Sequence, residues 1–261
     1  MNRMRFRWFS PFASMAILLA ATIPALGEEP QPSSSAWELL RAKYYGDRPM
    51  GEVDETFMSL EAPATTPDPA ATPLTLRFAQ DHRRIEHVRV FIDNNPSPLV
   101  AAFDFAGTPL TEINMRVRID RFTSVRAIAE MADGGLEMRS TWVKASGGCS
   151  APPGAAGAGA LGEIRLRTSA DAKSLQVGIR HPNASGFQID PRTGDAIAAR
   201  YISMIRITAG GKPVLDAQTG ISLSENPTLR IVSGAPLPLP IAVDAVDSET
   251  HAHYTASNGS P

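Results

Sequence analysis

Cysteine is almost absent from this chain of 261 residues, which has one, Cys149. A single thiol excludes an internal disulfide, a cysteine zinc site, a CxxC redox pair and a cysteine-ligated iron–sulfur cluster. A strong charge of either sign is missing as well, because 25 Lys and Arg stand against 27 Asp and Glu, a formal net charge of −2. This balance argues against a nucleic-acid binder held by phosphate neutralisation.

Long apolar runs are also lacking, apart from a short one near the N-terminus. Arg3, Arg5 and Arg7 precede an apolar run over 12–23, and small residues follow it at 24–27. This order is typical of a secretory signal peptide, which we expect over 1–27. The run is shorter than the ~20 residues that a membrane-spanning helix needs. We therefore expect an exported protein with no membrane attachment after cleavage.

Alternation of apolar and polar residues dominates the chain that follows. The clearest case is 113–119, where apolar residues alternate with Asn114, Arg116 and Arg118. Patterns of period two predict half-buried antiparallel strands, and turn sequences such as 93–96 and 133–135 separate them. Apolar residues at helical spacing occur only early, around 36–47. The sequence therefore predicts an all-β sandwich fold with a short N-terminal helix.

The composition changes abruptly at 146–162, a segment rich in Gly and Ala. Such residues have little side-chain area to offset the entropy cost of ordering, so the segment is predicted to be a flexible tether. Strand patterns resume after it. We expect one β domain over 36–145, a second and smaller one over 163–248, and a disordered tail over 249–261.

Cys149 lies within this tether, after Gly147 and Gly148 and before Ser150. A structural cysteine usually packs among apolar side chains, which this composition does not supply, so we expect a thiol that solvent reaches. A mobile thiolate is nucleophilic, and adducts on its sulfur can be passed on by exchange. Three interpretations stay open: a carrier thiol on a flexible arm, an accidental free cysteine, and a disulfide between two copies of the chain.

The histidines offer no assembled site. We interpret His82 and His87 as surface residues and His181 as a contact for a partner. His251 and His253 share one face of an extended chain and could hold a metal ion only weakly.

No common catalytic motif is present, because the sequence has no GxSxG, HExxH or Walker A pattern. Two charged groups are interpreted as solvated faces: the basic residues Arg116, Arg118 and Arg121, and the acidic residues Asp244, Asp247 and Glu249. We therefore expect a protein that is not an enzyme and that binds no cofactor and no metal.

Several segments resemble a sulfur-oxidation family. Residues 88–100, 125–135 and 147–149 resemble SoxY, the thiol-bearing subunit of the periplasmic sulfur-oxidation carrier. Four later segments resemble SoxZ, the partner subunit of SoxY: 181–186, 190–194, 198–202 and 220–227. The chain after the signal peptide thus resembles a SoxY–SoxZ fusion, of the kind associated with quinoprotein dehydrogenases.

The resemblance implies two immunoglobulin-like β-sandwiches, SoxY-like and then SoxZ-like, packed together in a periplasmic protein. It also implies that Cys149 is the residue to which sulfur intermediates, as in thiosulfate oxidation, attach covalently. The implied partners are periplasmic sulfur-oxidation enzymes or a dehydrogenase dependent on pyrroloquinoline quinone (PQQ).

One departure from the family pattern concerns the arm. In SoxY the glycine–cysteine arm ends the chain, whereas here Ser150 and a second domain follow Cys149. The arm would therefore enter a partner as a hairpin. The alternative interpretation is a non-covalent accessory or scaffold protein of a periplasmic quinoprotein dehydrogenase, in which Cys149 is incidental.

Overall fold

The computed structural model describes residues 1, 35–79, 85–154 and 159–259. The predicted signal peptide over 1–27 lies, except for Met1, outside the described residues, so export and cleavage stay predictions. Within the described ranges, no helix has both the length and the apolar character that a membrane crossing requires.

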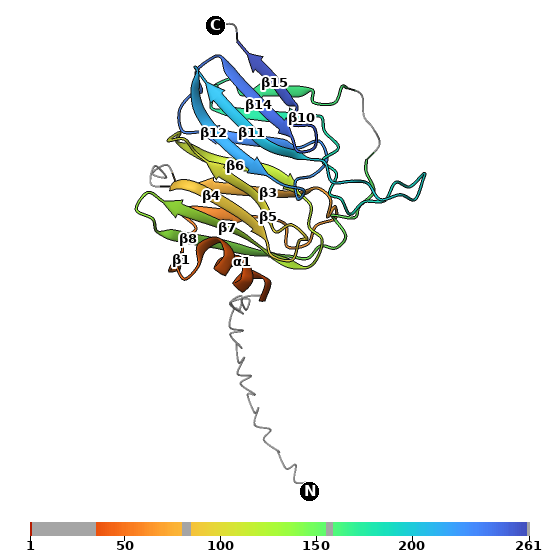
Figure 1. Ribbon diagram of the computed structural model, residues 1–261. Helices are drawn as coiled ribbons and strands as arrows, with labels where there is room; N and C mark the ends of the chain where they lie inside the picture. The colour runs from red at the N-terminus through yellow and green to blue at the C-terminus, as the bar shows by residue number, and fades with distance from the viewer. Residues whose placement is uncertain (2–34, 80–84, 155–158, 260–261) are drawn as a thin grey trace. The chain divides into compact units, whose positions relative to one another are not determined.

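Strands make up most of the described chain, and one helix precedes them (Figure 1). The elements, in chain order, are α1 (Ser35–Tyr45), β1 (Met50–Glu52), β2 (Met58–Glu61), β3 (Thr72–Phe78), β4 (Ile85–Ile92), β5 (Leu99–Asp104), β6 (Leu110–Val117), β7 (Thr123–Met131), β8 (Leu136–Val143), β9 (Ile164–Thr168), β10 (Ser174–Ile179), β11 (Ile202–Ala209), β12 (Lys212–Thr219), β13 (Thr228–Ser233), β14 (Ile241–Asp247) and β15 (His253–Asn258). The predicted all-β fold with a short N-terminal helix is confirmed.

The strands form two sheets, and each sheet contains strands from both halves of the chain. The nine-stranded sheet has the order β1-β8-β7-β4-β5-β12-β11-β14-β15, and the six-stranded sheet has the order β2-β3-β6-β13-β10-β9. The halves join where β5 pairs with β12 and where β6 pairs with β13, both antiparallel. The two β regions that the sequence predicts are therefore linked by continuous backbone pairing and not by the chain alone.

Apolar side chains between the sheets form one core that spans both halves. Ile113, Met115 and Val117 of β6 are buried in it, as the alternation at 113–119 predicts. Ile205 of β11 and Leu229 of β13 belong to the same cluster. Burial of this kind is the main favourable contribution to folding, so the two halves stabilise each other.

Helix α1 covers the face of the nine-stranded sheet that points away from this core. Trp37 and Tyr45 pack there against Phe91 of β4, Ile128 of β7 and Leu136 of β8. This cover explains why β7 is buried on both faces, with eight of its nine residues buried.

The C-terminal strand contradicts one prediction. β15 pairs with β14 from Ile241↔Asn258 to Val246↔His253, so the expectation of a disordered tail over 249–261 is wrong for 253–258. The sequence gives no apolar pattern for this strand, because it lies at the edge of its sheet and no side chain in 253–258 is fully buried. An edge strand can be polar throughout and still be held by backbone hydrogen bonds to its neighbour.

Candidate functional site

Residues 146–151 form a tight turn around Cys149, called the cysteine turn below. The Gly147 amide donates to the Asp120 carbonyl at 2.8 Å, and the Gly148 amide donates to the Ile119 carbonyl at 3.0 Å. The Cys149 amide donates to Asp120 Oδ1 at 3.3 Å. Three successive amides therefore hold the turn against the segment that follows β6.

The two glycines of the turn are needed for different reasons. Gly147 has φ +78°, in the left-handed region that favours glycine. At Gly148, a Cβ atom would lie 2.2 Å from the Pro69 carbonyl oxygen and 2.5 Å from the Ile119 carbonyl oxygen. The backbone of Gly148 thus lies too close to two other backbone segments for any side chain to fit.

The second half of the chain closes over the turn from the other side. Ser185 Oγ donates to the Cys149 carbonyl, and Gln188 Nε2 donates to the Ala151 carbonyl at 2.9 Å. Farther along, the Gly154 amide donates to Glu225 Oε2 at 2.7 Å. Cys149 therefore lies between the two halves and is held by both.

This position contradicts the prediction of a thiol that solvent reaches, because Cys149 is 0% exposed. The prediction of a flexible tether over 146–162 is also wrong for 146–154, which make the hydrogen bonds just described; residues 155–158 lie outside the described residues. The neighbours of Cys149 in sequence, which are small and give no cover, do not decide its burial. The cover comes from segments distant in sequence, around Ile119 and Ser185.

Burial also sets the chemistry of the thiol. Loss of solvation raises the pKa of Cys149 to about 12; the negative charge of Asp120 acts in the same direction, and the positive charge of Arg118 acts against it. The thiolate is the reactive form of cysteine. In this closed position the thiol therefore stays protonated and unreactive near neutral pH.

Arg118 is a buried cation at the same site. Its Nη1 donates to the Asn183 carbonyl at 2.8 Å and to the Leu223 carbonyl, and its side chain belongs to the largest fully buried ones. The prediction of a solvated basic face is thus wrong for Arg118, whereas Arg116 and Arg121 are exposed. Segments of the second half cover Arg118, and periodicity within one strand cannot predict such cover.

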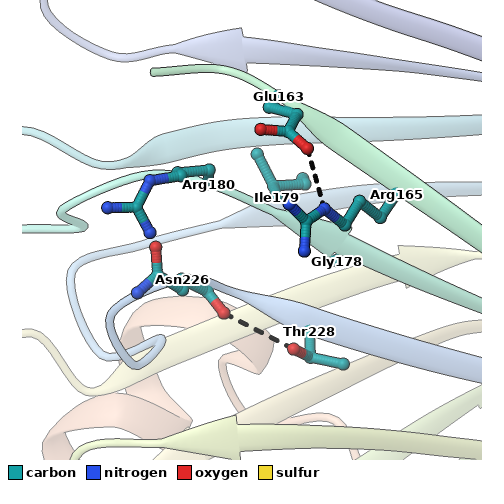
Figure 2. Close-up of a pocket in the computed structure, with 7 residues that line it drawn as sticks. All are labelled: Glu163, Arg165, Gly178, Ile179, Arg180, Asn226 and Thr228. Carbon is teal, nitrogen blue, oxygen red and sulfur yellow. Dashed lines mark hydrogen bonds and ion pairs between the residues drawn. The ribbon is translucent and has the colours of Figure 1, made fainter. Parts of the chain in front are cut away.

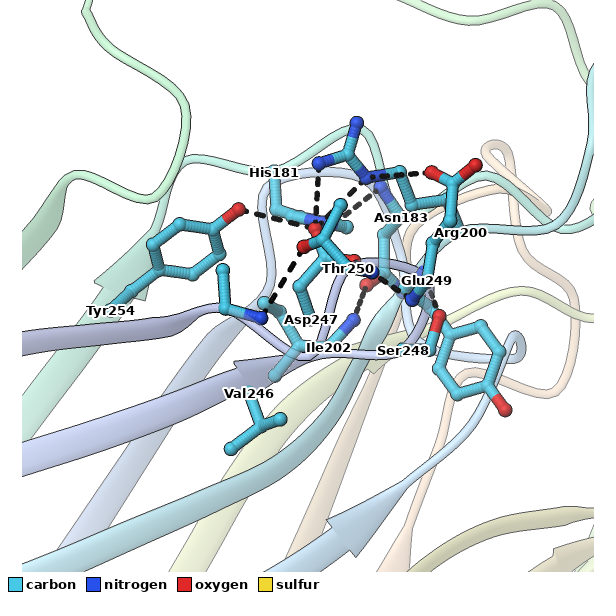
Figure 3. Close-up of polar contacts among 12 residues, drawn as sticks. His181, Asn183, Arg200, Ile202, Val246, Asp247, Ser248, Glu249, Thr250 and Tyr254 are labelled. Carbon is cyan, nitrogen blue, oxygen red and sulfur yellow. Dashed lines mark hydrogen bonds and ion pairs between the residues drawn. The ribbon is translucent and has the colours of Figure 1, made fainter.

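A polar network around Asp247 supports this side of the site (Figure 3). Asp247 Oδ2 lies 3.2 Å from His181 Nε2 and 2.8 Å from Arg200 Nη2, and it accepts a hydrogen bond from the Tyr254 hydroxyl at 3.1 Å. His181 Nδ1 accepts from the Asn183 amide at 3.0 Å, so the ring proton is on Nε2 and points to Asp247. His181 and Asp247 are buried, which contradicts their interpretation as a partner contact and a solvated residue.

The pKa shifts in the network have clear causes. Burial lowers the pKa of His181, although its hydrogen bond to Asp247 opposes the shift. Burial would raise the pKa of Asp247, but hydrogen bonds from Arg200 and from the amides of Thr250 and Glu249 hold it well below its usual range. His181 is therefore a neutral imidazole. It lies beside the Asp247 carboxylate, whose negative charge is stabilised by these hydrogen bonds.

Asn183 connects this network to the cysteine site. Its carbonyl accepts from Arg118, its Nδ2 donates to the Leu223 carbonyl at 2.8 Å, and its Oδ1 accepts from the Ile202 amide at 2.9 Å. Ser185, which holds Cys149, follows two residues later. The network thus fixes the loop that covers the thiol.

A separate surface pocket of about 170 Å³ is lined by residues of β9, β10 and β13 and by residues next to these strands (Figure 2). Glu163 and Arg165, which both line it, form an ion pair at 2.7 Å. Cys149 does not line it. No cluster of His, Cys, Asp or Glu in the described part of the chain is arranged to hold a metal ion, and His253 pairs instead with Asp244 at 2.9 Å.

The comparison with protein families matches these two halves. Residues 41–149 match the family "Sulfur oxidation protein SoxY", and residues 164–257 match "Sulphur oxidation protein SoxZ". The chain is a SoxY–SoxZ fusion. The SoxY match ends at Cys149 itself. The described residues up to Gly154 are called the SoxY half below, and those from Gly159 the SoxZ half. The cysteine turn thus belongs to the SoxY half, and Ser185 and Gln188, which cover it from the other side, belong to the SoxZ half.

The solved structures that are similar include the "sulfur carrier protein SoxY from Chlorobium limicola f thiosulfatophilum". The similarity covers 42% of this chain and 92% of that chain, at 22% sequence identity and a TM-score of 0.35. No curated protein matches the chain.

Proposed function

We propose that this chain is a periplasmic carrier and not a catalyst, in which Cys149 holds a sulfur-containing intermediate covalently and presents it to partner enzymes. Membership of the SoxY and SoxZ families supports a role in sulfur oxidation. The observation that carries the proposal is the position of Cys149, the one cysteine of the chain, at the end of the SoxY match and under the SoxZ half.

The closed cysteine turn suits a carrier between two reactions. A thiol whose pKa is raised to about 12 is protected from non-specific oxidation and from thiol–disulfide exchange. To be loaded, the turn must leave its cover. Opening breaks the hydrogen bonds from Ser185 and Gln188 and the one to Glu225, and it also breaks those to Ile119 and Asp120 in the SoxY half. Each such bond stabilises the closed form by about 0.5–1.5 kcal/mol net, and opening leaves the apolar core between the sheets intact, so it costs less than global unfolding.

The chain continues from Gly154 into the SoxZ half, so the opened turn is presented as a hairpin. A partner must therefore accept two strands of backbone at its entrance. Periplasmic sulfur-oxidation enzymes or a PQQ-dependent dehydrogenase are the partners we propose, the second on the resemblance alone.

Intact-mass analysis of the protein isolated from its native compartment tests the proposal. We expect species heavier than the mature chain by the mass of a sulfur-containing group, located on the peptide that contains Cys149 and absent from Cys149→Ser. The same spectrum measures the N-terminus, expected near Glu28. Unmodified thiol under all growth conditions, with an unchanged phenotype for Cys149→Ser, would contradict the carrier role.

The burial of Cys149 also favours a second candidate function, that of a non-covalent scaffold for a quinoprotein dehydrogenase. If the thiol never leaves the turn, Cys149→Ala should copurify with the dehydrogenase and support its full activity. The same burial disfavours a disulfide between two chains, which would require two open turns. A gel without reductant should accordingly show the monomer mass and no band at twice that mass.

A further inference from the structure

The six-stranded sheet has an outer face that no described helix covers. Helix α1, the one helix among the described residues, packs on the nine-stranded sheet instead. Along the strands of the six-stranded sheet, polar and charged side chains alternate with apolar ones that pack in the core, so the polar ones point outward. This outer face is called the basic face below, because it presents five arginines: Arg77, Arg116, Arg165, Arg167 and Arg230.

Positive charge exceeds negative charge on the basic face. The six strands carry two carboxylates, Glu61 and Glu112, against the five arginines, and they carry no lysine and no aspartate. Glu112 pairs with Arg77 at 3.1 Å and with Arg230 at 2.6 Å, so two guanidinium groups share one carboxylate. The whole chain, in contrast, has a formal net charge of −2. The basic face is therefore a local feature, of the kind that attracts partners of opposite charge.

The pocket of about 170 Å³ shown in Figure 2 lies at one end of the basic face. Gly178 lines it and pairs in register with Arg165 of β9 on one side and with Thr228 of β13 on the other. A Cβ atom at Gly178 would meet nothing within 4 Å. Glycine weakens the interior of a strand and often marks a place where a ligand approaches the backbone closely. Gly178 thus keeps open a space that a larger side chain would fill.

Several hydrogen-bond donors line this pocket. Figure 2 shows Arg180 and Arg165 on two sides of it, with Asn226 and Thr228 along a third. The ion pair with Glu163 uses the Nε atom of Arg165. A planar guanidinium has further N–H groups, and their geometry matches that of a carboxylate. The pocket is therefore suited to a carboxylate of a bound molecule.

The pocket also lies next to the loop that holds the chain leaving the cysteine turn. Asn226, which lines the pocket, directly follows Glu225, the acceptor of the Gly154 amide. Asn226 Oδ1 accepts from the His181 amide at 3.2 Å, which connects the same loop to the Asp247 network. A molecule bound in the pocket would therefore contact a loop that takes part in closing the turn.

We propose that the basic face docks a partner protein with an acidic surface, and that the pocket takes an aspartate or glutamate side chain of that partner. The inference rests on the proposed function and names the chemistry of the partner's surface. Among the described residues, none of the strongly exposed large apolar side chains lies on the strands of this face. Binding to a membrane surface draws on buried apolar area, so the face suits a protein better than a bilayer.

The test uses the purified full chain with fluorescein-labelled peptides as probes. Hexa-aspartate represents the acidic surface, and hexa-asparagine is the neutral control of similar size. Fluorescence anisotropy measures binding in about 25 mM salt, where charges are weakly screened. We expect hexa-aspartate to bind at least ~10-fold more tightly than hexa-asparagine and to dissociate as the salt concentration rises.

Two variants test the pocket itself. Arg165→Gln removes a charge-assisted contact and should weaken hexa-aspartate binding roughly tenfold. Gly178→Val fills the pocket without changing any charge and should weaken binding about fivefold. Valine is favoured in strands and a Cβ atom meets nothing there, so this variant should fold.

Each variant has a matched control. Arg206 is an exposed arginine of the nine-stranded sheet that pairs with Asp216, as Arg165 pairs with Glu163, so Arg206→Gln removes an equivalent charge elsewhere. Gln176 lies two residues from Gly178 on the same face and does not line the pocket, so Gln176→Val controls for the added valine. Both controls should change hexa-aspartate binding by less than about twofold.

Equal binding of the two peptides would overturn the proposal, and so would equal weakening in Arg165→Gln and Arg206→Gln or unchanged binding in Gly178→Val. Sedimentation of the chain with phosphatidylglycerol vesicles that Arg165→Gln abolishes would also overturn it, because the face would then belong to a membrane. Cys149→Ser should bind hexa-aspartate as the wild type does. A failure here therefore leaves the carrier role standing, whereas a failure of the carrier role is detected by the absence of adducts in the native compartment.

Discussion

The SoxY and SoxZ halves meet in two places, and the two contacts differ in kind. At the sheet junction, β5 pairs with β12 and β6 with β13 in continuous register, and the side chains of these strands enter the common core. At the cysteine turn, the SoxZ half contributes a few hydrogen bonds, from Ser185 and Gln188 and to Glu225. The sheet junction stabilises the whole fold, whereas the contact at the cysteine turn covers only the thiol of Cys149.

The two contacts differ because the strands and the cysteine turn differ in amino-acid composition. The strands supply Phe103, Ala217 and Ile231, whose burial removes apolar area from water at about 25 cal/mol per Å². The cysteine turn consists of small residues and has almost no side-chain area to bury. Regions held by few apolar contacts open locally at a fraction of the global free energy of unfolding. One interface can thus be permanent while the other opens.

The largest expected effect is at the sheet junction. Ala217→Asp places a charge on the core-facing side of β12, opposite Phe103, where Ala217 is fully buried. We expect it to reduce the free energy of unfolding by roughly 4 kcal/mol or more, or to prevent folding. Gln218→Asp is the matched control, because Gln218 is the next residue of β12 and is exposed, and it should cost below about 1 kcal/mol. Urea unfolding measures both, and equal effects would contradict a core shared by the two halves.

The next effect concerns the turn alone. Gly148→Ala forces a Cβ atom against the carbonyls of Pro69 and Ile119, which are backbone groups and cannot move aside cheaply. We expect the closed form to lose about 2 kcal/mol and the rate of Cys149 labelling by a maleimide to rise roughly 30-fold. Gly178→Ala is the control, since a Cβ atom there meets nothing within 4 Å. An unchanged labelling rate in Gly148→Ala would show that the turn is not closed as described.

Alkaline pH should weaken the closed turn. The folded pKa of Cys149 is about 12, and an unfolded cysteine has a pKa of about 8.5, so the unfolded state binds fewer protons between these values. Stability is therefore unaffected below about pH 8.5 and falls by up to about 1.4 kcal/mol per pH unit above it. The loss ends when it equals the cost of opening, because an open turn ionises normally.

The comparison of wild type with Cys149→Ser isolates this effect. Tyr45, whose pKa burial also raises to about 12, is present in both proteins and cancels. Urea unfolding at pH 7, 9 and 10 should show the stability of wild type falling relative to Cys149→Ser above pH 8.5. Parallel curves over the whole range would mean that the thiol is already accessible to solvent.

The smallest expected effect distinguishes a hydrogen bond between the two halves from a hydrogen bond within the cysteine turn. Ser185→Ala removes the donor to the Cys149 carbonyl, and we expect about 1 kcal/mol less stability for the closed form and roughly fivefold faster labelling. Ser150→Ala is the control, because Ser150 Oγ donates to the Gly147 carbonyl within the turn and is exposed. A larger effect from Ser150 than from Ser185 would place the closure within the SoxY half alone.

The sequence predicts those parts of the fold whose signal is local. Alternation at 113–119 marks β6 because a strand exposes its two faces in turn, whatever it packs against. The same alternation assigns Arg118 to a polar face, and it misleads there because Asn183, which covers Arg118, lies 65 residues further along the chain. Burial of Cys149 was missed for the same reason. A residue flanked by glycines can be buried when other segments supply the side chains.

The most direct test of the account follows labelling of Cys149 in the wild-type chain at increasing low concentrations of urea. If the turn opens while the sheets stay paired, the labelling rate is independent of urea in this range, because local opening exposes little surface. It should then join the global unfolding curve only near the transition. A labelling rate that rises from the start with the full slope of global unfolding would show that Cys149 is exposed only when the whole chain unfolds, and would contradict a turn built to open.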